Sequence, residues 1–223
     1  MGIPVLILGE SGSGKTYSIK NLDPEKVGIF LCEKNRLPFR KSFPTYKVRN
    51  MRKEEDGKVT IYRQSVVIQS LLRSKRKEDL KKILVIDDSQ YIMANEYFDR
   101  ASEKGYDKFV DIGANFRNLV HLVNDELPDD VIVYFLHHPE MDSNTGRQKA
   151  KTIGKMLDEK LTLEGCFDIV LHARTDGEAH WFSTQSDGTD TAKSPEEMFE
   201  AKIPNDLAFV DKTIREYYGM EEI

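Results

Sequence analysis

A glycine-rich segment near the start of the chain has the residue types and the spacing of a phosphate-binding loop. It reads GESGSGKT over residues 9–16 and follows an apolar run at residues 4–8. Glycines let successive backbone N–H groups turn toward a phosphate, the lysine reaches the β- and γ-phosphates, and the threonine hydroxyl ligates Mg²⁺. We therefore predict a site for a nucleoside triphosphate and Mg²⁺, with Thr16 as a metal ligand. The residues predicted to contact the nucleotide are Gly9, Glu10, Ser11, Gly12, Ser13, Gly14, Lys15, Thr16 and Tyr17.

Carboxylate side chains follow two other apolar runs of the chain. Asp87 and Asp88 come directly after ILVI at residues 83–86, and Glu33 comes directly after VGIFLC at residues 27–32. Asp87 is the predicted second Mg²⁺ ligand, acting through water. Glu33 is the predicted general base that polarises the attacking water, and Asp88 is the competing candidate. The alternative for each is a solvated polar residue in an ordinary turn.

Two adjacent histidines, His137 and His138, follow the apolar run VIVYFL at residues 131–136. Neighbouring residues of a strand point to opposite faces of a sheet, so the two rings do not chelate one ion together. Because no third ligand stands at a suitable spacing, we do not predict a zinc site. One of the two histidines is predicted to sense the γ-phosphate through a hydrogen bond, and plain packing is the alternative.

The apolar runs and the helical patterns between them define the elements that position these residues. Near-continuous apolar runs are typical of strands in a parallel sheet that is covered on both faces. Strands are predicted at residues 4–8, 27–32, 45–49, 83–86, 131–136, 167–173 and 180–184, the last two forming a hairpin. Helices are predicted at residues 15–22, 64–80, 90–103, 108–126, 153–161 and 205–218. This alternation predicts a single α/β domain over residues 1–223, with a mostly parallel central sheet flanked by helices and an antiparallel hairpin at its edge.

Composition limits the functions that are open to the chain. It has 223 residues, of which 39% are hydrophobic and 32% charged, and its formal net charge is −5. An acidic chain lacks the overall charge that attracts nucleic acid, so such a contact requires a local basic patch. The two cysteines, Cys32 and Cys166, are predicted to be reduced. With no signal peptide and no membrane-spanning apolar run in the sequence, we expect a cytoplasmic protein without a membrane partner.

Taken in order, these motifs resemble those of the RecA-like P-loop ATPases. The chain is most similar to the compact RecA-core ATPases that bacteriophages carry beside single-strand annealing genes. The resemblance rests on GESGSGKT, FLCEKN, ILVIDDS and VIVYFLHHPE, and on a later stretch that is similar to the C-terminal hairpin of that family. It implies an ATP- and Mg²⁺-dependent ATPase that acts with single-stranded DNA in recombination or repair.

The resemblance also implies roles for particular residues and partners. Glu33 matches the catalytic glutamate, and His137 or His138 matches the polar residue that links the γ-phosphate to a DNA-binding loop. That loop carries the basic residues Arg147, Lys149 and Lys151, and Lys193 is a candidate for a cation that reaches a neighbouring subunit's γ-phosphate. We expect a homo-oligomer, with a phage annealing or single-strand-binding protein as a possible partner. The first predicted strand begins at about residue 4, so the segment with which RecA packs onto its next protomer is not expected, which leaves filament formation open.

The residues themselves leave two other functions open. A small-molecule or nucleotide kinase also begins with a phosphate loop, and Arg36 and Arg40 could bind its acceptor. Kinases of this type shield the reaction from water with an arginine-rich lid, whereas residues 139–155 contain one arginine, Arg147. A nucleotide-gated interaction module, in which hydrolysis is incidental, is the third possibility. The ATPase is the function that the sequence favours.

Overall fold

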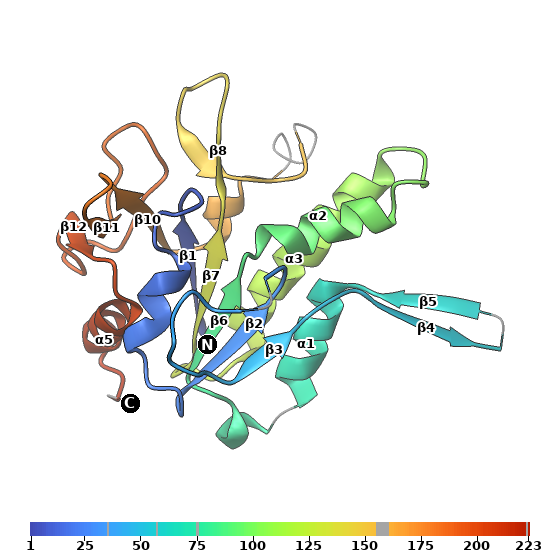
Figure 1. Ribbon diagram of the computed structural model, residues 1–223, viewed down its shortest axis with the longest axis horizontal. Coiled ribbons are helices and arrows are strands. Elements are labelled where there is room, and N and C mark those ends of the chain that lie inside the picture. The colour runs from blue at the N-terminus through green and yellow to red at the C-terminus, as the bar shows by residue number, and fades with distance from the viewer. Residues whose placement is uncertain (35, 57, 75, 155–160, 222) are drawn as a thin grey trace.

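The central element of the protein is an eight-stranded sheet (Figure 1). The computed structural model describes residues 1–34, 36–56, 58–74, 76–154, 161–221 and 223. The strand order is β12-β11-β10-β1-β7-β6-β2-β3, in which the six strands from β10 to β3 are parallel and β11 is antiparallel to both of its neighbours. The strands are β1 (Ile3–Leu8), β2 (Val27–Leu31), β3 (Thr45–Lys47), β6 (Ile83–Asp87), β7 (Ile132–His137), β10 (Ile169–Thr175), β11 (His180–Ser183) and β12 (Lys202–Pro204). This confirms the predicted α/β class and the antiparallel edge.

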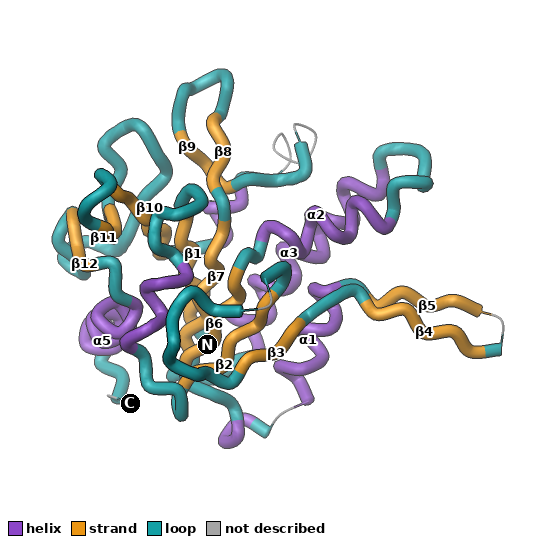
Figure 2. The backbone as a smooth tube through the Cα atoms, in the orientation of Figure 1, coloured by secondary structure: helices purple, strands orange, loops and turns teal. Residues whose placement is uncertain are grey.

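Helices cover both faces of the sheet because its central strands bury both of theirs (Figure 2). Successive side chains of β1 alternate between two cores: Leu6 and Leu8 lie in one, and Val5 and Ile7 lie in the other. The first core is completed by α1 (Gln64–Ser74), α2 (Gln90–Asp99) and α3 (Asp107–Glu126). The second is completed by the 3₁₀ helix η1 (Thr16–Asn21) and by α5 (Leu207–Tyr218).

The topology brings the ends of distant strands together at one edge. Strand β1 pairs with β7, and β7 pairs with β6, so residues that follow these three strands are neighbours in space although they are far apart in the sequence. Strand β2 lies next, on the other side of β6. Because all four strands are parallel, their carboxyl ends share one edge, where α/β proteins bind ligands near the point at which the strand order reverses.

The structure differs from the sequence-based expectations in several elements. The segment after the phosphate loop is a 3₁₀ helix and not an α-helix, and α1 ends at Ser74, followed by a 3₁₀ turn, η2 (Lys77–Asp79). The helix expected at residues 153–161 falls mostly on residues 155–160, which lie outside the described part of the chain. A further 3₁₀ helix, η3 (Leu163–Cys166), follows that region. Short helices of this kind lack the long apolar periodicity that sequence patterns detect.

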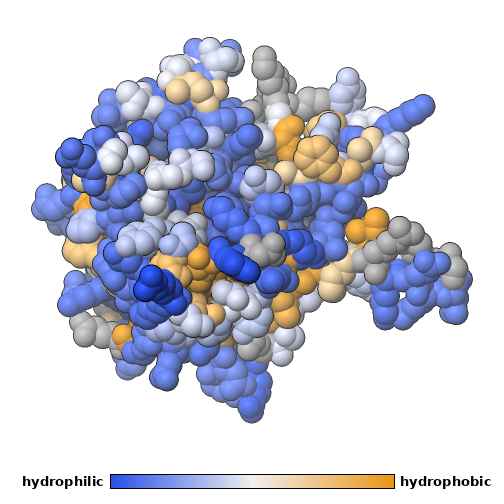
Figure 3. Space-filling view, in the orientation of Figure 1, coloured by the Kyte–Doolittle hydropathy of each residue, from blue (hydrophilic) through white to orange (hydrophobic). Residues whose placement is uncertain are grey.

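Two hairpins outside the main sheet were not predicted. Strands β4 (Met51–Glu55) and β5 (Lys58–Tyr62) form a ribbon that extends away from the body of the protein (Figures 1 and 3). Strands β8 (Pro139–Met141) and β9 (Gln148–Ala150) form the second hairpin, directly after β7. The Asp-Gly dipeptide at residues 56–57 is a hairpin signal that could have revealed the first ribbon. Figure 3 also shows that the visible face is mostly hydrophilic. No helix in the described residues is long and apolar enough to cross a bilayer.

Candidate functional site

The phosphate loop connects β1 to η1 at the carboxyl edge of the sheet. Gly12 and Gly14 adopt φ values of 83° and 92°, a left-handed conformation that side chains disfavour. The Lys15 side chain is folded back onto the loop, where its Nζ donates to the carbonyl of Gly9 and, at 3.0 Å, to that of Glu10. Burial lowers the pKa of Lys15 to about 8, so the ammonium is still mostly protonated at neutral pH. The loop therefore holds a positive charge in place for a phosphate.

Thr16 and Asp87 meet as the predicted metal ligands. The Thr16 hydroxyl donates to Asp87 Oδ1 at 2.8 Å, across the space between β1 and β6. Asp87 is only 1% exposed, and its Oδ2 has no hydrogen-bond partner among the described residues. Burial and the neighbouring Asp88 raise the pKa of Asp87 to about 6. A buried carboxylate oxygen without a partner is costly unless a cation binds it, so this pair fits Mg²⁺, which prefers oxygen ligands.

Asp88 lies at the centre of a cluster of charged groups. Its backbone has a φ of 58°, an uncommon conformation for a residue other than glycine, which turns the chain sharply after β6. Its carboxylate lies 3.1 Å from Lys34 Nζ and 3.5 Å from His138 Nε2. Burial raises the pKa of Asp88, but the hydrogen bond with His138 and the charge of Lys34 outweigh it and hold the pKa below its usual value. The carboxylate therefore stays ionised beside the loop.

Glu33, the predicted base, occupies a different environment. It follows β2 directly and is exposed, and its backbone carbonyl accepts a hydrogen bond from Arg49 at 2.6 Å. Its neighbour Lys34 reaches Asp88, so Glu33 lies near the mouth of the site. It is not among the described residues that line the cavity beside the phosphate loop. The structure thus brings Asp88 into the charged cluster and leaves the Glu33 carboxylate in solvent.

That cavity has a volume of about 410 Å³ and is large enough for a nucleotide. Its walls come from the phosphate loop, from the segment after β2, and from single residues of β11 and of the segment after β7. The described lining residues are Glu10, Ser11, Gly12, Gly14, Lys15, Thr16, Tyr17, Lys34, Arg36, Pro38, His138 and His180. The sequence did not indicate Lys34, Pro38 or His180 as site residues. Lys34 directly follows Glu33 and could have been found from that position, whereas His180 lies in a different strand and carries no local signal.

The two adjacent histidines have different surroundings, as the strand alternation predicts. His138 lines the cavity and contacts Asp88, so it is the one placed to meet a phosphate. His137 is completely buried, with its Nδ1 2.8 Å from Ser89 Oγ and its Nε2 2.8 Å from the carbonyl of Lys151. A carbonyl only accepts, so Nε2 carries the proton and Nδ1 accepts from the Ser89 hydroxyl. His137 thereby joins the turn after β6 to the end of the β8–β9 hairpin.

We expect His137 to make the protein sensitive to acid. Burial lowers its pKa to about 4, against about 6.5 in an unfolded chain. Between these values the unfolded chain binds the proton more tightly, so the free energy of unfolding falls as the pH drops from about 6.5 to 4, by about 3 kcal/mol. In His137→Gln this part of the loss should disappear when urea unfolding is measured from pH 7.5 to 4. The same pH dependence in variant and wild type would contradict the prediction.

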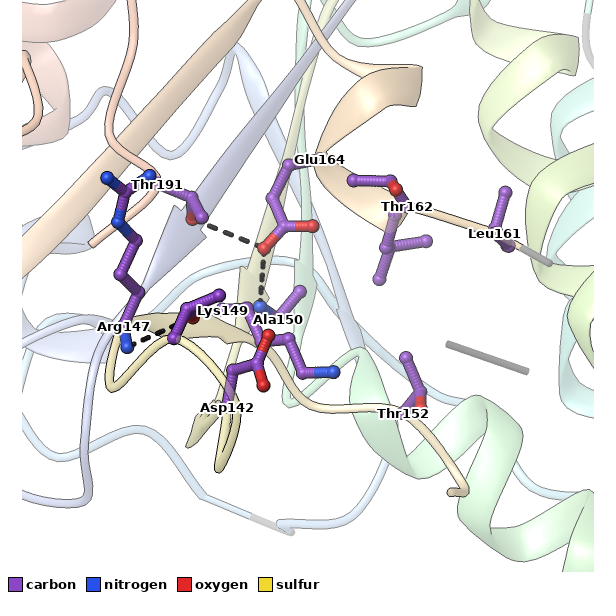
Figure 4. A pocket seen from close by; sticks show the side chains of 11 residues that line it. Asp142, Arg147, Lys149, Ala150, Thr152, Leu161, Thr162, Glu164 and Thr191 are labelled. Carbon is purple, nitrogen blue, oxygen red and sulfur yellow. Dashed lines mark hydrogen bonds between the residues drawn. The ribbon is translucent and has the colours of Figure 1, made fainter. Parts of the chain in front are cut away.

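The predicted DNA-binding residues lie on the β8–β9 hairpin and just after it. Arg147 and Lys151 are exposed, and Lys149 is partly covered and lies 3.9 Å from Glu140. A cavity of about 250 Å³, lined mainly by residues with polar side chains, lies beside the hairpin (Figure 4). There Glu164 accepts hydrogen bonds from the Ala150 N–H at 2.7 Å and from the Thr191 hydroxyl at 3.2 Å. These bonds fix the base of the hairpin to the body and leave basic side chains facing solvent.

Lys193 lies beside β10, on the side opposite β1. Its carbonyl accepts from the Val170 N–H at 2.8 Å, and its N–H donates to the Val170 carbonyl at 2.9 Å. It is half-buried and belongs to the segment between β11 and β12. Its role toward another subunit stays a prediction, because a single chain contains no such interface.

Comparison with known proteins agrees with this geometry. No curated protein sequence matches the chain. A family model described as an AAA domain matches residues 1–204, which span all the strands of the central sheet and the phosphate loop. Domains of this type are P-loop domains of the ATPase type. The chain therefore belongs to the AAA domain family.

Proposed function

We propose that the protein is a Mg²⁺-dependent ATPase that acts with single-stranded DNA. The observation that carries the hydrolytic part is the Thr16–Asp87 pair beside the Lys15 ammonium, with Asp87 Oδ2 buried and unpaired among the residues that the structure describes. These groups supply two metal ligands and a cation for the phosphates, the parts that phosphoryl transfer requires. Bound Mg²⁺ would neutralise charge that develops on the phosphates. His138 would donate to the γ-phosphate from the opposite wall.

We propose Glu33 as the general base in preference to Asp88. The pKa of Asp88 is lowered and its oxygens face Lys34 and His138, which makes it a poor proton acceptor. Glu33→Gln should lower kcat about 100-fold with little change in KM, whereas Asp88→Asn should lower kcat less than about 10-fold. Steady-state phosphate release measures both. The reverse order of effects would assign the base to Asp88.

The DNA part of the proposal rests on the basic hairpin. Its exposed cations are linked through the Lys151 carbonyl to His137, and through Ser89 to the residues at the metal site. Single-stranded oligonucleotide should bind and should raise the rate of ATP hydrolysis. In Arg147→Ala/Lys151→Ala the slope of log affinity against log salt should fall by about 1.4, since about 0.7 ion is released per phosphate contact.

The matched control is Arg76→Ala/Lys104→Ala, which removes the same charge from exposed positions elsewhere. It should leave both the salt slope and the stimulation unchanged. Equal effects of the two double variants would mean that binding reflects net charge and not the hairpin. No change in hydrolysis with oligonucleotide would remove DNA as the activator.

A kinase is the second candidate, because Lys34 and Arg36 line the cavity and offer two cations to an anionic acceptor. Phosphate release without any acceptor supports the ATPase, and strict dependence on an acceptor supports the kinase. ATP binding without either reaction would leave a nucleotide-gated interaction module. We further propose a homo-oligomer, in which Lys193 would act toward a neighbouring subunit.

A further inference from the structure

Two side chains from the C-terminal part of the chain contact backbone carbonyls of the phosphate loop, and one of them, His180, also lines the nucleotide cavity. His180 Nδ1 lies 3.0 Å from the carbonyl oxygen of Ser13, and Asn205 Nδ2 donates to the carbonyl of Gly14 at 3.2 Å. A carbonyl only accepts, so His180 carries its proton on Nδ1. Each of two successive loop carbonyls therefore has a side-chain donor from another element.

The two donors leave no room for a side chain at position 14 unless they move. A Cβ on Gly14 would lie 2.2 Å from Asn205 Nδ2 and 3.0 Å from His180 Nδ1, and the residue also has a φ of 92°. Glycine at this position therefore adopts the left-handed conformation without strain and lets both donors approach the loop. The sequence motif indicates only the first of these.

Both donors stand on ordered elements. His180 is the first residue of β11, where it pairs with Thr175 of β10, and Asn205 directly follows β12. The next residue, Asp206, caps α5 by accepting from the Ala208 N–H at 2.9 Å and also accepts from Asn21, the last residue of η1, at 2.7 Å. The junction of β12 and α5 therefore holds both the loop and the helix that follows it.

We propose that His180 and Asn205 are positioning residues for the bound nucleotide. In a trans peptide the carbonyl of one residue and the N–H of the next point in opposite directions. The Ser13 carbonyl is held by His180, and the Gly14 carbonyl is held by Asn205 together with the Ser18 N–H at 3.0 Å. These donors therefore keep the N–H groups of Gly14 and Lys15 turned away from the carbonyls and toward the phosphate. Preorganised donors of this kind cost no reorganisation when the ligand binds. Asn205 lies just beyond the residues that match the AAA domain family.

The test measures MgATP binding by calorimetry and the steady-state parameters of hydrolysis. Asn205→Leu and His180→Leu should each weaken MgATP binding about 10-fold, the effect of one hydrogen bond, and should raise KM with kcat changed less than about threefold. His180→Asn should restore most of the affinity, because the asparagine Nδ2 takes the place of the histidine Nδ1. If the two side chains had a purely structural role, the leucine variants would lower the free energy of unfolding. They would not raise KM with kcat nearly unchanged, and His180→Asn would not restore the affinity for MgATP.

The control is Glu178→Ala, in the exposed turn that precedes β11, which should bind MgATP like the wild type. His180 is itself exposed, so its variants should fold even if Asn205→Leu does not. The inference rests on the proposed function, and the two fail differently. A wild-type protein that does not bind MgATP overturns the proposed function. If the wild type binds MgATP and both His180→Leu and His180→Asn bind it equally tightly, the positioning role is overturned.

Discussion

Replacing Lys15 with alanine should lower the rate of ATP hydrolysis by about 100- to 1,000-fold, which corresponds to about 3–4 kcal/mol of transition-state stabilisation. The Lys15 ammonium is buried in the phosphate loop, and within the described part of the chain it donates only to the Gly9 and Glu10 carbonyls of that loop. It can therefore turn to a phosphate without breaking a described contact elsewhere. Charge develops on the phosphate oxygens in the transition state, where a cation in a site shielded from water has its largest effect. Phosphate release at saturating MgATP measures the loss.

Lys26→Ala is the matched control for Lys15→Ala. Lys26 is half-exposed and pairs with Asp23 at 3.9 Å, and it precedes β2, at the opposite edge of the sheet from the site. Its removal should leave the rate unchanged. A Lys15→Ala protein that hydrolyses ATP at the wild-type rate would show that the cavity beside GESGSGKT is not the active site.

Replacing Arg215 with methionine should lower the free energy of unfolding by about 3–5 kcal/mol. Arg215 is only 1% exposed and belongs to α5, which packs on one face of the sheet. Its guanidinium donates to Asp211 at 2.7 Å, to the Asp130 carbonyl at 2.9 Å and to the Lys82 carbonyl at 3.3 Å. Burial already raises the pKa of Asp211, so removal of the cation leaves a buried carboxylate whose charge is uncompensated.

Urea unfolding at pH 7 measures this loss, with Arg73→Met as the control. Arg73 pairs with Glu126 at 2.5 Å, but both side chains are exposed, and exposed pairs add little to stability. The double variant Arg215→Met/Asp211→Leu should recover part of the loss, because it removes both charges together. Equal stability of Arg215→Met and Arg73→Met would contradict the role assigned to the buried pair.

Local patterns were sufficient for most of the central sheet and for the phosphate loop. The runs that became β1, β2, β6, β7 and β10 are mostly apolar and buried, because both faces of each strand meet a layer of helices. Their buried polar residues are Asp87, His137 and His172. The β4–β5 ribbon escaped detection because its strands bury little and so lack a continuous apolar run. Likewise, short 3₁₀ helices are too brief for a helical period to appear.

Within the site, spacing predicted which residues follow the strands but not how they would pair. Adjacent residues such as Asp87 and Asp88 look alike in the sequence, yet one faces Thr16 and the other faces Lys34 and His138. The same holds for His137 and His138, of which one is enclosed in the core and the other lines the cavity. Burial and charge partners set these differences, and both depend on elements far away in the sequence.

The nucleotide loop, the order of the strands along the chain and the carboxylates at their ends follow from the sequence, because glycine conformation and side-chain alternation act over a few residues. The tertiary structure alone decided that β7 separates β1 from β6 and that His180 and Asn205 contact the phosphate loop. It also decided that one Asp87 oxygen has no partner within the described ranges of the chain. Each of these depends on groups that become neighbours only when the sheet assembles. No local pattern in the chain contains that information.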